Sequence, residues 1–460
     1  MREWEAATWA TGQTEANVIR LVGQRLADRA RQLTPASGAI LILAGKGHNG
    51  DDARAARESL TDRGVNLLEI STPETMLPAL DAALAKRPAL VIDGLFGIGL
   101  DRPLAEPWQK VIAAVNAAKI PVLAVDIPSG LNADTGEIFG AAIEATVTLT
   151  VGAPKIGMLA EKAWPYVGRL EVAADIGLIP CPFKSEQSWI NAESFRHFPP
   201  ARLAAGHKGT YGHLAIIAGS FGYHGAAVLT TRGAQRAQPG LTTLYTQENV
   251  YSVVAPQLQS AMVNLWRPDL KLPEGVTGLT LGTGMPAREI LESLRRNLQL
   301  WWRDLDVPVV LDASALDVLS SGPAVKRIGR VITPHPGEAA RLLNSTTAKV
   351  QAHRVAAVRE LSKKYGNCWV VLKGHQTVVG RSEGEIYINS TGNPHLAQGG
   401  SGDLLSGYIA GLLAQPPLQS DIAKTICYGV WQHGAAADKL QATRANWTIE
   451  DLANELGNTR

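Results

Sequence analysis

A chain of 460 residues, at roughly 150 residues per domain, is long enough for two or three domains. Its 44 lysines and arginines nearly balance its 42 aspartates and glutamates, which excludes the strong charge imbalance of many nucleic-acid-binding or membrane-surface proteins. Hydrophobic residues make up 45% and there are only three cysteines, which excludes a disordered chain, a disulfide framework and a zinc cluster. We expect a cytoplasmic protein, because the first residues, MREWE, are charged and no apolar stretch reaches the roughly 18 residues needed to cross a bilayer.

Short apolar runs in the first part of the chain predict a buried sheet. They lie at 38–45, 65–70, 89–92 and 121–125, and the segment 52–60 is predicted to be a helix. Runs of Val, Ile and Leu without polar alternation are typical of strands buried on both faces, as in parallel sheets. Ligands of such sheets bind at the carboxyl ends of the strands, so we expect the functional residues in the turns that follow.

A second set of apolar runs comes after a segment with little periodicity. Residues 179–206 contain four prolines and are predicted to connect two α/β domains, at 1–190 and 200–460. Strands of the second domain are expected at 213–219, 279–281, 308–312, 330–333 and 369–373, and a helix at 404–413. The sequence therefore predicts two α/β domains without an internal repeat.

Three strand ends in the first domain carry glycines together with Asn or Asp. Residues 45–52 read GKGHNGDD, and Asp93 and Asp126 each directly follow an apolar run. One such turn is weak evidence, because glycine suits any tight turn and Asp often caps a helix. A parallel sheet would bring all three turns to one edge. We therefore expect an oxygen-rich site there for a cation and a phosphate-bearing ligand.

The sequence GGSGD at 399–403 precedes the predicted helix of the second domain. Backbone N–H groups of such a turn can stabilise the charge on a transferred phosphoryl group, and Asp403 can take the proton from an attacking hydroxyl. The alternative is that Asp403 only caps the helix. We interpret the turn as an anion hole beside a general base, which predicts phosphoryl transfer.

The motifs HNGDD, VIDGLFGIG, AVDIPSGLNADTG and APKIG resemble the NAD(P)HX epimerase family over about residues 35–178. The resemblance implies a Rossmann-like three-layer sandwich in which Asn49, Asp93 and Ser129 hold a potassium ion. It implies that Asp126 is catalytic and contacts the substrate. The other residues that it implies for substrate binding are His48, Asn49, Gly50, Asp51, Asp52, Gly97, Ile98, Gly99, Leu100, Asp101, Arg102 and Pro103.

This chain departs from the epimerase pattern at two places. Asp51 replaces a glycine, and we expect its charge to repel the phosphate of the substrate. The segment 16–22 also lacks the family's usual Leu-Met-Glu-Asn-Ala-Gly signature.

The second domain resembles the ADP/ATP-dependent NAD(P)HX dehydratases, which belong to the ribokinase-like superfamily. The motifs are HKGTYGH, AGS, GAA, TPHPGE, LKGHQT, GSGD and HGAAAD, in this order, over about residues 205–440. The resemblance implies a ribokinase-like three-layer sandwich. It implies that the adenine nucleotide binds to Lys373, Gly374, His375, Gln376, Thr377 and Gly402, and that Ala226, Gly284, His335 and Asp403 face the hydrated dinucleotide. By residue type alone, a turn histidine such as His335 is more often structural.

Together, the two resemblances predict a bifunctional enzyme that repairs hydrated nicotinamide nucleotides. The first domain would interconvert the R and S epimers of NAD(P)HX with potassium bound. The second would dehydrate the S epimer while converting ADP, with Mg²⁺, into AMP and phosphate, and Asp403 would be its catalytic base. We also expect a homo-oligomer. The alternative is a ribokinase-like kinase of a vitamin precursor or sugar whose first domain binds nucleotides without catalysis.

Overall fold

The computed structural model describes residues 1–267, 269–285, 292–323 and 329–459. The chain forms two compact units, Met1–Lys184 and Ser185–Arg460. The segment 179–206 was predicted to be only a connection between the domains, but its residues 187–190 form a strand of the second unit's sheet. The predicted first domain, 1–190, included this strand, whereas the structure has it in the second unit.

The first unit is built on a parallel sheet whose six strands run in the order β2-β1-β3-β4-β5-β6. The strands are β1 (Ile40–Ala44), β2 (Val65–Glu69), β3 (Leu90–Gly94), β4 (Val122–Val125), β5 (Val147–Val151) and β6 (Arg169–Ala173). Four of them confirm the predicted runs, whereas β5 and β6 were not predicted. All neighbouring pairs are parallel, so the turns after the strands lie at one edge of the sheet.

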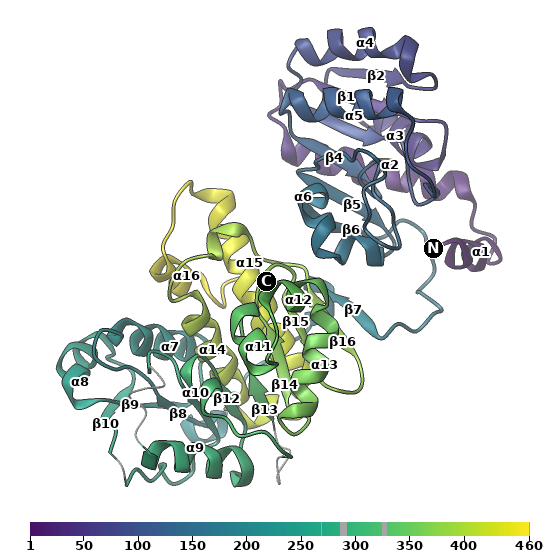
Figure 1. Ribbon diagram of the computed structural model, residues 1–460. Coiled ribbons are helices and arrows are strands. Elements are labelled where there is room, and N and C mark those ends of the chain that lie inside the picture. The colour runs from purple at the N-terminus through teal and green to yellow at the C-terminus, as the bar shows by residue number, and fades with distance from the viewer. Residues whose placement is uncertain (268, 286–291, 324–328, 460) are drawn as a thin grey trace. The chain divides into compact units, whose positions relative to one another are not determined.

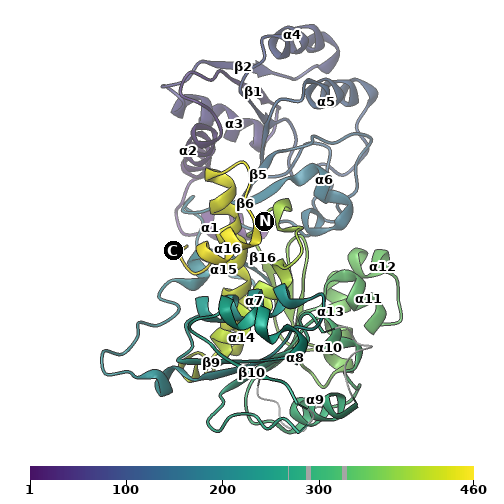
Figure 2. The same ribbon diagram turned by 90° about the vertical axis from the view of Figure 1, so that its left-hand side faces the viewer.

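Helices cover both faces of this sheet, so the first unit is a three-layer sandwich (Figures 1 and 2). Alternate residues of β1 point to opposite cores: Ile40 and Ile42 pack with α2 (Glu15–Leu33) and α3 (His48–Ser59). Leu41 and Leu43 pack with α4 (Pro73–Ala85) and α5 (Glu106–Ala118). Two short helices, α1 (Arg2–Trp9) and α6 (Trp164–Val167), complete the unit.

The second unit contains, within the described residues, a sheet in the order β10-β9-β8-β11-β12-β13-β14-β15-β16-β7. Its strands are β7 (Gln187–Ile190), β8 (His213–Ile217), β9 (Leu241–Thr246), β10 (Met262–Leu265), β11 (Gly278–Leu281), β12 (Val309–Leu311), β13 (Arg330–Ile332), β14 (Trp369–Leu372), β15 (Val378–Gly380) and β16 (Ile386–Asn389). The pairings from β10 to β14 are parallel, and β15 pairs antiparallel with β14 and β16. All five predicted strands of this domain are confirmed.

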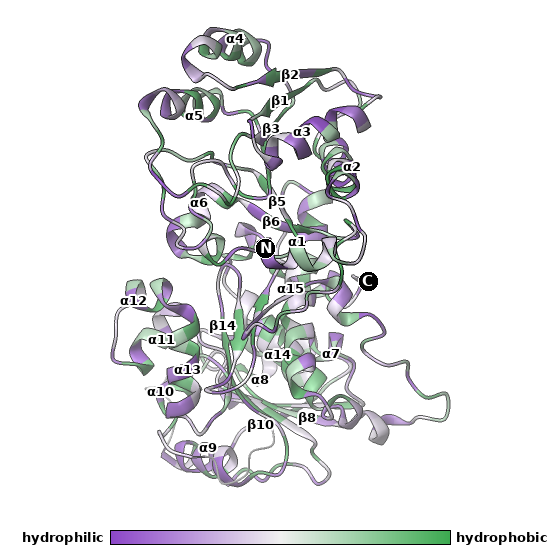
Figure 3. Cartoon of the chain, turned by 90° about the vertical axis from the view of Figure 1, so that its right-hand side faces the viewer, coloured by the Kyte–Doolittle hydropathy of each residue, from purple (hydrophilic) through white to green (hydrophobic). Residues whose placement is uncertain are grey.

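Helices also lie on both faces of the second sheet (Figure 1), and the strands are more hydrophobic than the outer helix surfaces (Figure 3). They are α7 (His224–Arg236), α8 (Glu248–Val254), α9 (Glu292–Asp304), α10 (Ser314–Asp317), α11 (Pro336–Leu342), α12 (Thr347–Ala352), α13 (Arg354–Lys364), α14 (Ser401–Leu413), α15 (Ile422–Thr443) and α16 (Ile449–Glu455). No described helix is long and apolar enough to span a membrane.

The two helices α7 and α14 approach one another unusually closely. A Cβ atom on Gly233 of α7 would overlap the carbonyl oxygen of Leu404, and one on Gly407 of α14 would overlap that of Thr230. Glycine is therefore required at this crossing, because any larger residue would push the helices apart.

Candidate functional site

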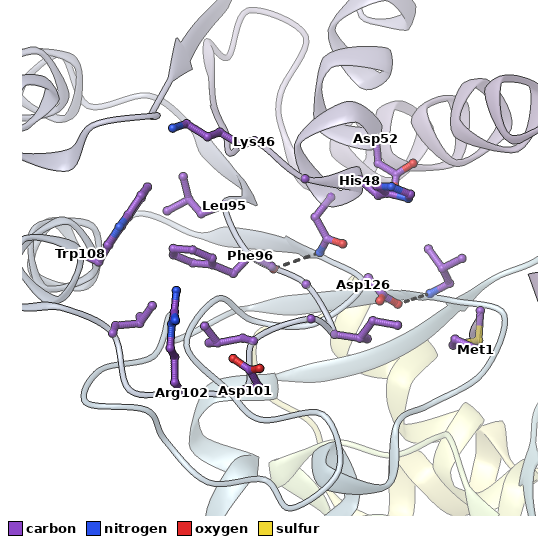
Figure 4. Close-up of a pocket in the computed structure, with 18 of the residues that line it drawn as sticks. Met1, Lys46, His48, Asp52, Leu95, Phe96, Asp101, Arg102, Trp108 and Asp126 are labelled. Atoms are coloured by element: carbon purple, nitrogen blue, oxygen red, sulfur yellow. Dashed lines mark hydrogen bonds between the residues drawn. The ribbon is translucent and has the colours of Figure 1, made fainter. Parts of the chain in front are cut away.

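The first unit holds a cavity of about 990 Å³ at the carboxyl edge of its sheet (Figure 4). It is lined by residues that directly follow β1, β2, β3 and β4, as expected for a parallel sheet. Among the residues that the sequence analysis predicted, His48, Asn49, Asp52, Asp126 and the whole segment 97–103 line this cavity. Residues of α1, which were not predicted, also line it.

The three predicted potassium ligands lie in one buried network. Oγ and N of Ser129 donate hydrogen bonds of 2.7 and 2.9 Å to the carboxylate of Asp93, which is fully buried. Nδ2 of Asn49 donates to the carbonyl oxygens of Phe96 and Val125, at 3.1 and 2.6 Å. Burial raises the pKa of Asp93, and the hydrogen bonds from Ser129 oppose that shift. The carboxylate, hydroxyl and carbonyl oxygens gathered here are the hard ligands that suit a potassium ion.

Asp126 is held by a lysine that the sequence analysis did not single out. Its carboxylate pairs with Nζ of Lys155, and both side chains are less than one-tenth exposed. Oδ1 of Asp126 also accepts hydrogen bonds from Oγ1 of Thr150 and from N of Val151, at 3.1 and 2.9 Å. Lys155 stands in the APKIG motif just after β5, so its signal is a lysine placed beside a buried strand end.

The two neighbouring carboxylates of α3 have different environments. Asp51 does not line the cavity; its Oδ1 lies 2.7 Å from Nη1 of Arg54. The repulsion of phosphate that we expected from Asp51 is therefore reduced by this ion pair. Asp52 lines the cavity and is 8% exposed. Burial, together with the charges of Asp126 and Asp51, raises the pKa of Asp52 to about 8.

Two glycines of the first turn are needed for packing inside the protein. A Cβ on Gly45 would overlap the carbonyl oxygen of Leu95, and one on Gly50 would overlap that of Gly45. A Cβ on Gly47 would meet no atom within 4 Å. Only Gly47, which also lines the cavity, leaves room for a ligand at this turn.

In the second unit a lysine and three carboxylates converge at the first turn of α14. Nζ of Lys373, after β14, lies 2.7 Å from Oδ1 of Asp312, after β12. It lies 4.0 Å from Oε2 of Glu338 in α11. A Cβ on Gly402 would lie 3.3 Å from this Nζ, so Gly402 leaves the ammonium accessible from the helix turn. Asp312 and Glu338 were not predicted as site residues.

The electrostatics of this cluster favour a proton acceptor. Burial lowers the pKa of Lys373, but the charges of Asp312 and Glu338 outweigh it and raise the pKa overall. Burial and the charge of Asp312 raise the pKa of Asp403 to about 6. The N-cap of α14 is Gly400 and no side-chain cap bond is present in this described helix, so Asp403 does not cap it.

Helix α15 holds the loop that leads into α14. The carboxylate of Asp438 accepts hydrogen bonds from N of Gly392 and Nδ2 of Asn393, at 3.0 and 3.1 Å. Burial lowers the pKa of His433 to about 4, and its ring contacts the backbone of Ser401. Its Nε2 has no hydrogen-bond partner among the described residues. The neutral form of His433 is therefore the one that fits this place.

The predicted nucleotide turn 373–377 is shaped by backbone strain and by an arginine. Gly374 and Gln376 have φ angles of 125° and 50°. Oγ1 of Thr377 donates to the carbonyl oxygen of Gly374 at 3.0 Å, and Nη2 of Arg354 donates to that of Leu372 at 2.9 Å.

The residues predicted to face the dinucleotide lie in two places. A Cβ on Gly284, whose φ is 63°, would lie 2.6 Å from Cβ of Ala226, so these two residues are adjacent. His335 is the N-cap of α11, and its Nδ1 accepts a hydrogen bond from N of Gly337 at 3.0 Å. The structural role that residue type favours for His335 is thus present, while its side chain remains 53% exposed.

Comparisons with known proteins agree with both resemblances. A family described as NAD(P)H-hydrate dehydratase matches residues 214–459, and one described as YjeF-related protein N-terminus matches residues 69–157. The bifunctional NAD(P)H-hydrate repair enzyme of Coxiella burnetii is 33% identical over 95% of this chain and 93% of its own. That of Escherichia coli K12 is 32% identical over 96% and 88%.

Solved structures resemble the second unit. The ADP/ATP-dependent NAD(P)H-hydrate dehydratase from Bacillus subtilis, co-crystallised with ATP and Mg²⁺, is 33% identical with a TM-score of 0.51. The match covers 56% of this chain and 92% of that one. A ribokinase-like protein from Enterococcus faecalis, 23% identical over 60% of this chain and 96% of its own, has a TM-score of 0.52. The predicted ribokinase-like fold is confirmed.

Proposed function

The chain belongs to the family of bifunctional NAD(P)H-hydrate repair enzymes, and from this premise we propose that each compact unit carries one of the two activities. The first unit interconverts the R and S epimers of hydrated NADH and NADPH. The second unit dehydrates the S epimer and converts ADP into AMP and phosphate. The single observation that supports the second activity best is the cluster of Lys373, Asp312, Glu338 and Asp403 at the first turn of α14.

Dehydration requires a poor leaving group to become a good one. Hydroxide leaves the reduced ring slowly, whereas a phosphate ester leaves readily, driven by the lone pair of the ring nitrogen. In our proposal Asp403 takes the proton of the ring hydroxyl. The oxygen of this hydroxyl attacks the β-phosphorus of ADP, and AMP departs. The ester bond to carbon then breaks, inorganic phosphate leaves with the bonding electrons, and loss of the neighbouring proton restores the double bond.

The other residues of the cluster bind and orient. The ammonium of Lys373, held by two carboxylates, pairs with the transferred phosphoryl group, and the N–H groups of the 399–402 turn stabilise its charge. Residues 374–377 would hold the rest of the nucleotide. The carboxylates of Asp312 and Glu338 offer the oxygen ligands that Mg²⁺ prefers, and would hold it beside the nucleotide phosphates. When bound, Mg²⁺ neutralises phosphate charge.

For epimerisation, we assign opposite protonation states to two carboxyl groups in the cavity. Asp126 is a carboxylate because it pairs with Lys155, while Asp52, with a pKa of about 8, carries a proton at neutral pH. Asp52 donates its proton to the ring hydroxyl, which leaves as water, and the charge of Asp126 stabilises the cationic ring. Water then adds to the opposite face and returns a proton to Asp52.

We propose that Asn49, Asp93 and Ser129, with nearby carbonyl oxygens, hold a potassium ion that fixes the turns around this cavity. The supporting observation is that Ser129 is hydrogen-bonded to the buried carboxylate of Asp93, and that Ser129 and the amide of Asn49 both reach the carbonyl oxygen of Phe96. Replacing potassium by lithium in the buffer is expected to lower the rate of R-to-S conversion. Asp93→Ala should make that rate low and independent of the ion. An ion-independent rate in the unmodified protein would contradict this assignment.

The deciding experiment supplies the purified chain with NADHX epimers and either ADP or ATP. We expect the absorbance of the reduced nicotinamide to recover fully from both epimers, with release of inorganic phosphate. A ribokinase-like kinase would instead retain the phosphate on its product. Recovery from the S epimer alone would leave the dehydratase assignment standing and contradict the epimerase assignment.

We further propose a cytoplasmic homo-oligomer. The location is supported by three free cysteines, two of them buried, in the described structure. Analytical ultracentrifugation would test the oligomeric state, and a monomer at micromolar concentration would contradict it.

A further inference from the structure

The cavity of the first unit has two chemically different ends. Asp52 and Asp126 lie toward one end, near His48 and Met1, while Lys46, Arg102 and Trp108 lie around Phe96 toward the other (Figure 4). Helix α1 adds charges of both signs, because Glu5 and Arg2 both line the cavity, and the charge of Glu5 acts on Asp52. The proposed chemistry uses only the acidic end. At the other end the family resemblance implies only that Arg102 contacts the substrate, and it implies nothing for Lys46 and Trp108.

The two cations of this end are available to a ligand. Lys46 and Arg102 are both exposed, and neither makes an ion pair with any residue that the structure describes. By contrast, Arg54 and Lys155 nearby are paired with carboxylates. Asp101 precedes Arg102 and also lines the cavity, so one negative charge accompanies the two positive ones. A net positive end suits a phosphate group.

The aromatic pair offers a flat surface beside these cations. The ring centroids of Phe96 and Trp108 lie 4.7 Å apart with their planes at 72°, an edge-to-face contact that fixes the indole. Trp108 is half-buried and lines the cavity, so part of its ring remains open to a ligand. Aromatic side chains of this kind stack on nucleobases.

The assigned chemistry and the charges together decide which end of a dinucleotide lies where. The nicotinamide lies at the end that holds Asp52 and Asp126, because these groups are assigned to its reaction. The basic end attracts phosphate next to a ring that can stack on a purine. In dinucleotide-binding sites an arginine commonly accommodates the 2′-phosphate that distinguishes NADP from NAD. A ligand with a purine and a phosphate monoester close together is the one that fits both features.

We propose that Lys46, Arg102 and Trp108 bind the adenosine 2′-phosphate of the substrate, so that the first unit prefers hydrated NADPH to hydrated NADH. This inference rests on the proposed epimerase function, because it assigns the other end of the same substrate. Lys46 and Arg102 select the 2′-phosphate, and Trp108 binds the purine that both substrates share.

Calorimetry on the full chain tests this with two probes, adenosine 2′,5′-bisphosphate and adenosine 5′-monophosphate. Lys46→Ala and Arg102→Ala should each weaken binding of the bisphosphate about tenfold or more, since hydrogen bonds to charged groups are lost, and should leave the monophosphate within about twofold. Trp108→Leu should weaken both probes by a similar factor of about tenfold. A second, separate binding event that none of the three substitutions changes belongs to the nucleotide site of the second unit, and the variants are compared on the other event.

The matched control is Lys110→Ala, which removes a charge from the same helix as Trp108 at a residue that pairs with Glu106 outside the cavity. It should change neither affinity. Equal weakening of both probes by Lys46→Ala and Arg102→Ala would overturn the inference, because the cations would then read a phosphate common to both nucleotides. So would unchanged affinities in all variants.

The proposed function fails separately from this inference. If the bisphosphate binds as expected but neither NADPHX nor NADHX is epimerised, the subsite stands and the assigned reaction is wrong. If both are epimerised with equal kcat/KM, the reaction stands and the inference is wrong.

Discussion

Nζ of Lys373 lies 2.7 Å from Oδ1 of Asp312, in an ion pair whose lysine is 17% and whose aspartate is 2% exposed. The two residues come from turns after different strands, so the sheet fixes their geometry before any ligand arrives. Burial is the largest cause that raises the pKa of Asp403, and the charge of Asp312 adds to this increase while that of Lys373 opposes it.

Replacing Asp403 with Asn should remove the general base without disturbing the fold. The loss of a positioned base typically lowers a rate by about 10²–10⁴-fold, and we expect a decrease of this size in dehydration. The measurement is the rate of NADHX dehydration, with the melting temperature and nucleotide binding as controls. A folded variant that retains a rate within about tenfold of the unmodified enzyme would show that Asp403 is not the base.

The pH dependence of dehydration should follow the pKa of Asp403. With a pKa of about 6, the carboxylate is the active form above that pH, and kcat/KM should fall as pH decreases through 6. Asp312→Asn removes a charge that raises this pKa, so the acidic limb should move to lower pH while kcat decreases. An acidic limb that stays in place would separate Asp312 from the titration.

Lys373→Ala should weaken the binding of ADP more than that of NADH, used as a non-reacting dinucleotide, because the ammonium is proposed to pair with nucleotide phosphates. Isothermal titration calorimetry with each ligand separately measures this difference. Equal losses for the two ligands would mean that Lys373 only supports the local structure.

Asp51→Asn should change the KM of epimerisation by less than about threefold. The carboxylate already pairs with Arg54, which is also held by Glu69 and by the carbonyl oxygen of Gly45. Removing one of its several partners therefore leaves the arginine in place. A large decrease in KM would instead show that Asp51 repels the phosphate of the substrate, as the sequence predicted.

Asp52→Asn should stabilise the first unit at high pH while it lowers the epimerase rate. Because the folded-state pKa of about 8 lies above the unfolded value, the folded state binds the extra proton between pH 4 and 8, and the free energy of unfolding falls as pH rises through this range. Asn carries no such proton. Its advantage in melting temperature should therefore be larger at pH 8 than at pH 5, and an advantage that shrinks with pH would contradict the assignment.

The strands that the sequence predicted best are those with unbroken apolar runs, such as Ile40–Ala44. Strand β5 was missed because its sequence, VTLTV, alternates with threonines, yet Thr148 and Thr150 are fully buried. Their hydroxyls find partners inside the protein: Thr148 donates to the carbonyl oxygen of Val167 and Thr150 to Asp126. A hydropathy pattern counts such threonines as polar, so it does not reveal that they are buried and that the segment is a strand.

Within the candidate sites, local motifs located the strand-end turns but not the residues that reach them from elsewhere. Lys155 follows a strand that was not predicted, and Glu338 belongs to a helix cap beside His335. Their contacts with Asp126 and Lys373 depend on how strands are ordered in the sheets. A single sequence does not contain that order in any local pattern. The motifs APKIG and TPHPGE include Lys155 and Glu338, but which residues these two contact emerges only from the fold.

The close crossing of α7 and α14 places Ala226 near the start of one helix and Asp403 near the start of the other. In the proposed reaction the dinucleotide meets Ala226 and Asp403, and the phosphoryl group meets the 399–402 turn at the start of α14. The distance between the attacking oxygen and the phosphorus then depends on two backbones that touch at Gly233 and Gly407, where no side chain can change its rotamer to adjust it. A methyl group added at either glycine, far from both ligands, would therefore slow the transfer step while leaving both affinities nearly intact.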